Sequence, residues 1–243
     1  MMHRFGIQGW SSLANSEDHL PCRILVCWNP QTHAVLRINQ SPQWTTCRVT
    51  NKTTQASITI TVVYGYNTPA ERQPLWNYIQ QQRSITTSPW ILLGDFNAIM
   101  HPRDRAGGVS AWPGHMEDFP NCIDQSELIH LPYSGPKLSW NNGQSGSSNI
   151  QKKLDWVFGN QQLIQNWPAT TVMFQPRHIS DHSDMIVHIH QANRTMGTPP
   201  RFKFINAWTE RADFMALVER VWQTPIRGNP IFRITTKNAT VEG

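Results

Sequence analysis

Carboxylate, carboxamide and imidazole side chains stand next to predicted strands in this 243-residue chain. Asp95 and Asn97 are two residues apart directly after the apolar run at 90–94, so both can point into one cleft. Asp181 and His182 are adjacent just before another apolar segment. A carboxylate beside an imidazole suits a metal ligand next to a general acid or base. Each pair alone is also compatible with an ordinary turn or a capped, solvated loop.

Asp155 is a third acidic residue, and it lies between the strand-forming residues Leu154 and Trp156. Burying a carboxylate alone is too costly, so this one must be solvated or have a partner. The imidazolium of His182 would serve, because a carboxylate fixes the tautomer of a neighbouring imidazole and raises its basicity. We therefore expect Asp155 within hydrogen-bond distance of His182, and both near Asp95 and Asp181 at one mouth of the fold.

Tyr64 and Asn67 follow the clearest strand of the sequence. A phenol and a carboxamide can both donate hydrogen bonds to phosphate oxygens. Taken separately, an aromatic residue at this position is also typical of a core. Tyr64 and Asn67 are accordingly candidate substrate-binding residues.

The elements that must position these groups are mostly strands. In 57–64, Ile58, Ile60, Val62 and Tyr64 alternate with polar or β-branched residues, a period of two that indicates a strand with two distinct faces. The run 90–94 is apolar throughout, which is typical of a strand buried on both faces. Further strands are expected at 22–28, 34–38, 44–49, 138–140, 154–159, 171–175 and 184–190.

Three helices are predicted between or after these strands. Pro69 and Pro74 open the first, whose Leu75, Tyr78 and Ile79 form one stripe. The second spans about 114–124, with Met116, Phe119 and Ile123 inward, and contains Pro120, which would cost up to roughly 3 kcal/mol inside a regular helix. The third is amphipathic, with apolar residues at 214, 217, 218, 221 and 222. Helices interspersed among more numerous strands favour an α+β sandwich of two sheets over a doubly wound parallel sheet.

Composition bounds the remaining choices. Apolar residues make up 39% and charged residues 15% of the chain, which excludes disorder driven by excess charge. The net charge of +5 permits a polyanionic partner. The four cysteines form no CxxC pair, and no 18 apolar residues run together, so neither a disulfide framework nor a membrane span is expected. We expect an intracellular protein; its oligomeric state stays open.

The segments 64–67, 94–97, 154–156 and 180–183, each at a strand terminus, together resemble the endonuclease/exonuclease/phosphatase superfamily. The runs 94–97, 131–142, 153–156 and 179–183 are more similar still to the endonuclease domain of plant non-LTR (LINE-type) retrotransposon polyproteins, and the resemblance covers roughly residues 5–190. It implies an α+β fold, a four-layer α/β/β/α sandwich with its first strands missing. The domain would span 1–192, and 193–243 would be a linker and an amphipathic helix leading toward an absent reverse transcriptase.

The resemblance also implies metal-dependent phosphodiester hydrolysis by a DNA endonuclease that uses Mg²⁺ or Mn²⁺ and is nuclear if functional. Its partner would be DNA, without a membrane. Carried over residue by residue, Asp95 is a water-orienting base or a metal-side carboxylate, and Asn97 holds the phosphate. His182 stabilises or protonates the phosphate, Asp155 orients His182, and Asp181 helps to hold the metal. Tyr64 and Asn67 contact the phosphate.

Three alternatives stay open. The first is a metal-dependent nuclease domain with impaired activity. In the family, an initial strand, helix and strand end in a metal-binding Glu. Residues 30–63 contain no Asp or Glu, so we expect that block to be absent. The second possibility is a catalytically inactive remnant with at most weak nucleic-acid binding. The third is a lipid or inositol phosphate substrate, against which the run 131–142 favours the retroelement branch. His188 and His190 could suggest a zinc cluster, or simply a solvated strand face.

Overall fold

The computed structural model describes residues 8–15, 21–108, 112–190 and 214–223. The chain divides into two compact units, residues 1–193 and 194–243. The expected domain boundary and the linker at 195–200 lie outside the described residues. In the second unit, the predicted amphipathic helix is present as α4 (Phe214–Gln223). None of the described helices has the length and apolar character needed to cross a membrane.

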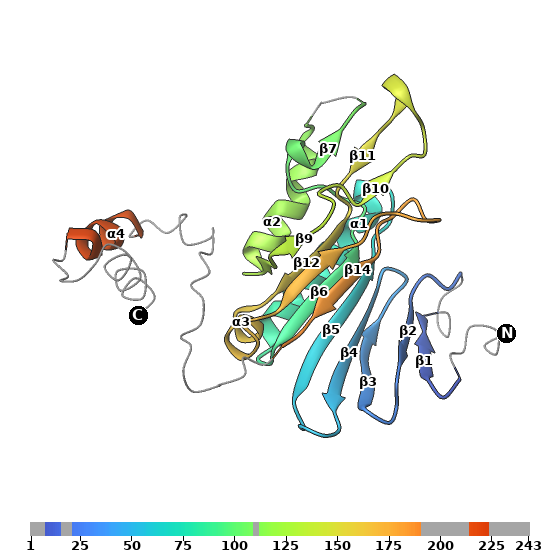
Figure 1. Ribbon diagram of the computed structural model, residues 1–243, viewed down its shortest axis with the longest axis vertical. Coiled ribbons are helices and arrows are strands. Elements are labelled where there is room, and N and C mark those ends of the chain that lie inside the picture. Colours follow the sequence, from blue (N-terminus) through green and yellow to red (C-terminus); the bar gives the residue numbers. More distant parts are fainter. Residues whose placement is uncertain (1–7, 16–20, 109–111, 191–213, 224–243) are drawn as a thin grey trace. The chain divides into compact units, whose positions relative to one another are not determined.

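A six-stranded sheet forms the centre of the first unit (Figure 1). β5 and β6 run parallel, and the other neighbouring strands are antiparallel. A parallel pair needs a crossover, which α1 (Pro69–Ile85) provides. In spatial order the strands are β3 (His33–Gln40), β4 (Trp44–Asn51), β5 (Ser57–Tyr64), β6 (Trp90–Asp95), β12 (Asp155–Gly159) and β8 (Ile129–His130).

The second sheet has three strands, in the order β14, β13, β9, with β13 and β9 parallel. Two small ladders complete the described strands: β1 pairs with β2, and β11 lies between β10 and β7. The bounds are β14 (Met185–His188), β13 (Thr171–Phe174), β9 (Tyr133–Ser134), β1 (Ser11–Ala14), β2 (Leu25–Trp28), β10 (Trp140–Asn141), β11 (Gln151–Lys152) and β7 (Arg105–Ala106).

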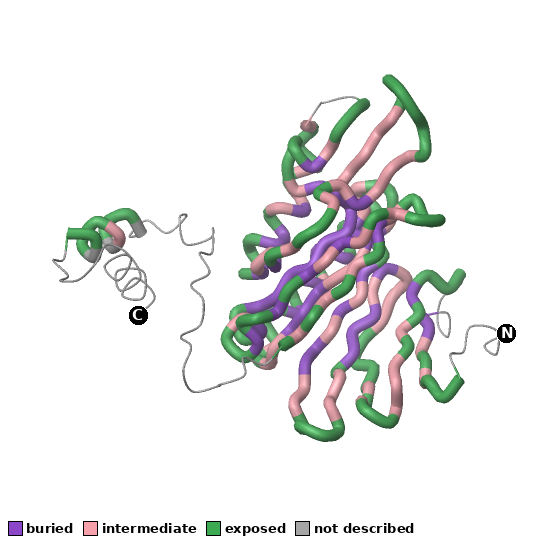
Figure 2. The backbone as a smooth tube through the Cα atoms, viewed as in Figure 1, coloured by how far each residue is buried: buried purple, intermediate pink, exposed green. Residues whose placement is uncertain are grey.

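The two faces of the central sheet bury different cores. One face packs under α1 and α2 (Asp118–Gln125), through Leu92 of β6 and Phe158 of β12. The other packs against the second sheet, through Leu93 and Val157 from the same two strands. Burial is accordingly concentrated in the middle of the molecule and falls off toward β2 and β3 (Figure 2). The predicted α+β sandwich of more than one sheet is confirmed.

The helix predicted at 114–124 differs from the structure at its start. A 3₁₀ turn (Gly114–Glu117) precedes α2, which begins at Asp118. Pro120 therefore lies in the first turn of α2, where a backbone N–H has no intrahelical acceptor, so the expected penalty does not arise. Phe119 and Ile123 are buried as predicted, whereas Met116 is only partly buried.

The stripe predicted on α1 is also modified. Leu75 and Ile79 are buried as predicted, and Trp76 joins them in the core. Tyr78 is only partly buried. Its ring stacks on Trp44, and its hydroxyl forms a 2.6 Å hydrogen bond with Thr46. α1 is thus attached to the sheet by a polar contact beside its apolar one.

Candidate active site

The register of β6 against β12 places two carboxylates side by side. Asp95 and Asp155 are direct cross-strand partners, so their side chains leave the sheet on the same face. Both are buried, with 9% and 7% of their surface exposed. Gly94 permits this arrangement, because a Cβ at that position would lie 2.1 Å from the carbonyl oxygen of Val63. β6 can approach β5 this closely only with glycine there.

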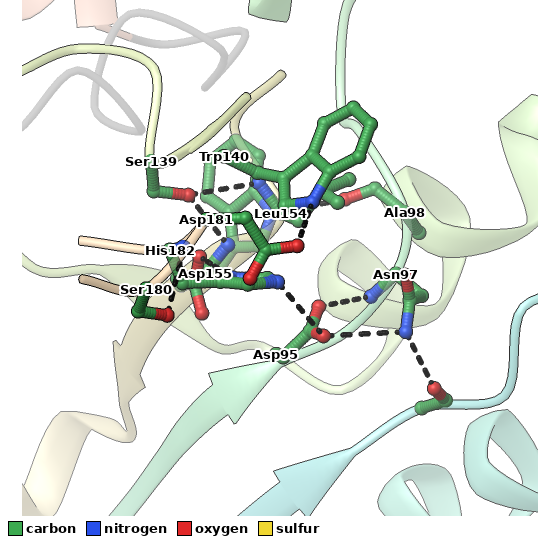
Figure 3. Close-up of polar contacts among 12 residues, drawn as sticks. Asp95, Asn97, Ala98, Ser139, Trp140, Leu154, Asp155, Ser180, Asp181 and His182 are labelled. Carbon is green, nitrogen blue, oxygen red and sulfur yellow. Dashed lines mark hydrogen bonds and ion pairs between the residues drawn. The ribbon is translucent and has the colours of Figure 1, made fainter. Parts of the chain in front are cut away.

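His182 reaches both carboxylates from the loop between β13 and β14. Its Nδ1 lies 2.8 Å from Oδ2 of Asp155, and its Nε2 lies 3.8 Å from Oδ2 of Asp95 (Figure 3). The hydrogen bond predicted between Asp155 and His182 is therefore present. The three side chains meet at one end of the sandwich, where the strands of the two sheets terminate.

Ser139 fastens the His182 loop to β12. Its hydroxyl oxygen accepts hydrogen bonds from the backbone N–H groups of Leu154 and Asp155, each at 3.1 Å. Its carbonyl accepts from the N–H of Ser183 at 2.7 Å. The neighbouring Trp140 forms an isolated antiparallel bridge with His182. Ser139 was not among the residues expected in the site. The only sequence signal for its role is a small polar residue inside the short predicted strand 138–140.

Asn97 holds Asp95 rather than standing apart from it. The backbone N–H of Asn97 donates to Oδ1 of Asp95 at 2.8 Å. Its side-chain Nδ2 donates to the carbonyl of Gly65 at 2.8 Å and to Oδ2 of Asp95 at 3.2 Å. The backbone is left-handed here, with φ of 49°, a conformation that asparagine tolerates better than most residues. Asn97 thus fixes both oxygens of the carboxylate.

The electrostatics of the cluster couple its three members. Burial, and after it the charge of Asp155, raise the pKa of Asp95 to about 6, against the N–H of Asn97 and the charge of His182. Burial alone would lower the pKa of His182, but the hydrogen bond and charge of Asp155 bring it above its ordinary value. A carboxylate and an imidazole whose pKa values are both raised are suited to proton transfer.

Asp95, Asp155 and His182 also form the metal-competent cluster among the described residues. Their ligand atoms lie within 4.8 Å of one another. Carboxylate oxygens are the ligands that Mg²⁺ and Mn²⁺ prefer, so the donor set fits a hard divalent cation. The carboxylates in this cluster are both aspartates, and one of them is engaged with His182.

Asp181 lies beside this cluster rather than within it. Its Oδ2 accepts a 2.9 Å hydrogen bond from Nε1 of Trp140, which lowers the pKa of the Asp181 carboxyl. The side chain is exposed, and its charge acts on both Asp95 and His182. Three of the four groups expected to converge therefore meet directly, and the fourth is held next to them by an indole.

Tyr64 ends β5 next to the cluster, and Asn67 follows on the chain that leaves this strand. Tyr64 is the parallel-strand partner of Asp95 and is 36% exposed, with the guanidinium of Arg23 5.5 Å from its ring centre. Asn67 is exposed, and its carbonyl accepts a 2.9 Å hydrogen bond from Arg72. Both side chains are thus accessible to a ligand.

Lys153 is a buried charge that the sequence analysis did not identify. It is 1% exposed, and its Nζ has no hydrogen-bond partner among the described residues. The ammonium instead lies 3.6 Å, 4.5 Å and 4.8 Å from the ring centres of Tyr133, Phe174 and Trp156. Burial lowers its pKa to about 8, against the charges of Asp104 and Asp155. An aromatic enclosure of this kind stabilises a cation through the ring quadrupoles.

Comparison with known proteins places this geometry among relatives. A model of the "Endonuclease/Exonuclease/phosphatase family" matches residues 18–182. No curated protein sequence matches. Among solved structures, the chain is similar to the endonuclease domain of TRAS1, a telomere-specific non-LTR retrotransposon, at 12% identity and a TM-score of 0.58, over 77% of this chain and 81% of that one.

Two further solved structures share the arrangement. The AP endonuclease LMAP from Leishmania major is 13% identical with a TM-score of 0.54, over 75% of this chain and 71% of that one. A protein from Bacteroides thetaiotaomicron, described as of the endonuclease/exonuclease/phosphatase family, is 11% identical with a TM-score of 0.51, over 74% of both chains. At these identities the likenesses show a common fold.

Proposed function

Because the chain belongs to the endonuclease/exonuclease/phosphatase family, we propose that it is a metal-dependent phosphodiesterase, a DNA endonuclease of retrotransposon origin. The observation that carries this proposal is the chain of contacts from Asp155 to His182 to Asp95, at 2.8 Å and 3.8 Å. Family membership supports the reaction class, and the likeness to the TRAS1 endonuclease domain supports the proposed origin.

The residues of the cluster take complementary roles in this proposal. Asp155 accepts a hydrogen bond from Nδ1–H of His182 and favours its imidazolium form, in which Nε2–H can donate to a phosphate oxygen. Asp95 is held by both hydrogen-bond donors of Asn97, so its free lone pairs point toward a water or a cation rather than rotating away. Both groups act at the same point, because Nε2 and Oδ2 of Asp95 are only 3.8 Å apart.

A divalent cation, Mg²⁺ or Mn²⁺, would be held by Asp95 with help from the adjacent Asp181. When bound, it supplies Lewis acidity toward the phosphate and lowers the pKa of a coordinated water. Tyr64, the strand partner of Asp95, and Asn67, three residues further along the chain, are both exposed and would hold the substrate phosphate by hydrogen bonds.

We also propose that this activity is impaired. Asp155 is committed to His182, so within the described cluster Asp95 is the carboxylate left for the cation. Mg²⁺ demands near-ideal octahedral geometry, and Asp181, whose Oδ2 is held by the indole of Trp140, lies beside this cluster rather than within it. The expectation that a strand ending in a Glu normally completes the site agrees with this shortage.

The test is nicking of supercoiled plasmid DNA by residues 1–243 in Mg²⁺ and in Mn²⁺. We expect slow or undetectable cleavage, and recovery when the strand, helix and strand that end in the metal-binding Glu of a family relative are fused upstream. In the fused protein His182→Ala should lower the rate by about 10² to 10⁴. His178→Ala is the matched control, because His178 is an exposed residue of the same loop. Equal rates with and without the fused segment would refute the proposed impairment.

The second candidate is a catalytically inactive protein that only binds nucleic acid. The short carboxylate set favours it, since binding to phosphates needs positive charge and no metal. It predicts salt-sensitive DNA binding that Asp95→Asn leaves intact, together with no cleavage even in the fused protein. Recovered cleavage that depends on His182 would exclude it.

A further inference from the structure

A cavity adjoins the catalytic cluster on the side of Asn97. It has a volume of about 70 Å³ and is lined in part by four basic side chains from α1, β7, the turn before α2, and β11. No aspartate or glutamate lines it, and apart from Asn97 the rest of its lining is apolar. The basic side chains are Arg72, Arg105, His115 and Lys152.

The positive charges around this cavity are poorly compensated. Arg72 is 8% exposed, and its Nη1 donates to the carbonyls of Tyr66 and Asn67 at 2.9 Å, while its buried Nε has no hydrogen-bond partner among the described residues. Asp118 and Asp95 act on Arg72 from outside the cavity lining. A buried guanidinium N–H without an acceptor is costly, and an anion in the cavity would relieve that cost.

Lys152 is a second positively charged group whose pKa reflects the positive electrostatic potential of the cavity. Burial lowers its pKa, and the positive charges of Arg105 and Arg72 lower it further. Three cationic groups thus repel one another around a space without a carboxylate. The first turn of α1 also borders this space at Pro69, and a helix N-terminus carries partial positive charge. Bringing an anion into this position converts mutual repulsion into attraction.

We propose that this cavity binds a phosphate group of a polynucleotide, next to the phosphate at the catalytic cluster. The inference rests on the proposed phosphodiesterase function and specifies its substrate class as a nucleic-acid strand rather than a small phosphate ester. Arg72 offers its unpartnered Nε–H to a phosphate oxygen, and Arg105, whose Nε donates to the carbonyl of Gly107 at 2.9 Å, offers its Nη groups. A cavity of about 70 Å³ has room for several waters, and a phosphoryl group can take their place.

Asn97 connects the two sites. Its side chain holds Asp95 and also lines the cavity. Leu154, immediately before Asp155, lines the cavity from the other strand. Lys152 then continues toward the cluster, with its Nζ 5.5 Å from the ring centre of Trp140, whose indole holds Asp181. A polymer with regularly spaced phosphates can occupy both sites at once, whereas a monoester cannot.

The test compares DNA binding by two double variants of the full 243-residue chain. Arg105→Gln with Lys152→Gln removes two cavity charges. Arg48→Gln with Lys52→Gln is the control with the same change in net charge; Arg48 is exposed and pairs with Thr59, at the end of β5 remote from Tyr64. The probe is a fluorescein-labelled 12-nucleotide single strand in EDTA, with anisotropy recorded over a series of salt concentrations. Thermal unfolding of both variants checks that each is folded.

We expect the cavity variant to lower the slope of log K against log salt by about 0.7, because the cavity holds one phosphate and each lost phosphate contact on a single strand accounts for about 0.7. The control should change the slope by much less. Equal slopes for the two variants would overturn the proposal. Arg72→Lys keeps the charge but removes the fork, so it should weaken binding with a smaller change in slope. Displacement of the oligonucleotide by low-millimolar inorganic phosphate would instead identify a free-anion site, and would also overturn it.

A single-phosphate ester separates this inference from the proposed function. Hydrolysis of bis(p-nitrophenyl) phosphate in Mn²⁺ by the fused protein should depend on His182 and be unaffected by the two cavity substitutions. An equal loss of hydrolysis in the His182 variant and in the cavity double variant would place the cavity in the catalytic centre and refute a separate subsite. Hydrolysis independent of His182, combined with the expected change in slope, would refute the proposed catalytic centre and leave the phosphate-binding cavity standing.

Discussion

His130 is an imidazole enclosed by aromatic rings, and its protonation should control acid stability. It ends β8 opposite Phe158, with ring-centre distances of 5.1 Å to Trp156, 5.4 Å to Tyr133 and 5.6 Å to Phe158. Burial lowers its pKa from 6.5 to about 4, and the charge of Lys153 contributes to the shift. Folding therefore disfavours the imidazolium.

The sign of the effect follows from proton binding. Between pH 6.5 and about 4 the unfolded chain binds a proton at His130 that the folded chain does not, so stability falls as the pH falls. An interval of this size corresponds to about 3 kcal/mol when fully expressed. By pH 5 about 2 kcal/mol of it should be lost relative to pH 7.5.

The measurement is urea unfolding of the wild-type chain and of His130→Leu at pH 7.5 and pH 5.0. Asp95 titrates in the same range with the opposite sign, because its folded-state pKa is raised to about 6. Its contribution is common to both proteins and cancels in their difference. We expect the stability of His130→Leu relative to wild type to rise by about 2 kcal/mol between pH 7.5 and pH 5.0.

The control for this series is His188→Gln, since His188 is exposed on β14 and stays hydrated on folding. Comparison with this variant isolates the part of the pH dependence that is specific to His130. The reasoning about His130 would be refuted by a wild-type minus variant difference that does not change with pH. A uniform destabilisation of His130→Leu by altered packing leaves the pH-dependent part measurable.

Three further predictions concern stability, each measured by urea unfolding at neutral pH. Lys153→Met should leave stability unchanged or raise it by up to about 2 kcal/mol, because it removes an ammonium without a hydrogen-bond acceptor and keeps the side-chain volume. Lys153→Ala should cost about 2 to 4 kcal/mol through the cavity it leaves. Equal losses of stability in the two variants would mean that the ammonium is net stabilising. Gly94→Ala should cost more than about 3 kcal/mol, since its Cβ would lie 2.1 Å from the Val63 carbonyl oxygen, and Gly143→Ala, which meets open space at φ +71°, only about 1 kcal/mol. Ser139→Ala should cost about 2 to 4 kcal/mol, because two buried backbone N–H groups of β12 lose their acceptor; a loss below 1 kcal/mol would show that water replaces the hydroxyl.

The long strands were predictable because their sequences carry a period. β5 has the bounds expected from the alternation of Ile58, Ile60 and Val62, and the two sets of residues do enter different cores. The strands β7, β9 and β11 have two residues each, which is too few to show a periodicity in the sequence. Their position depends on neighbours distant in the sequence.

The helix α3 (Gln161–Asn166) was missed although a local signal was present. Asn160 caps it, its side chain accepting a hydrogen bond from the N–H of Leu163, and asparagine is among the preferred residues at that position. Six residues are too few to show an apolar stripe, and Leu163 alone is fully buried. The cap was therefore the only local indication of a helix.

In the candidate site, the contact between Asp155 and His182 was predictable, because burying an unpaired carboxylate costs too much free energy. The contacts that support this pair were not predictable. Asp155 had to find a partner, and the sequence offered His182. Ser139 acts on the backbone of residues 15 and 16 positions away, and Lys153 is enclosed by rings from three separate segments. Neither arrangement leaves a pattern along the chain, since any serine or lysine would look the same.

The geometry of the candidate site is set by the packing of the core. Asp95 faces Asp155 only in the observed register, which apolar pairs such as the partly buried Leu93 with the buried Val157 fix a few residues away. A slip of one residue would turn Asp155 to the helix-covered face and carry every apolar side chain of β12 with it. The backbone contact from Phe96 to Leu154, at 2.9 Å, extends the same register beyond the last strand residue. A chain that folds at all must therefore bring the carboxylates together, so a lack of cleavage in the folded protein would reflect its supply of metal ligands and not a collapsed site.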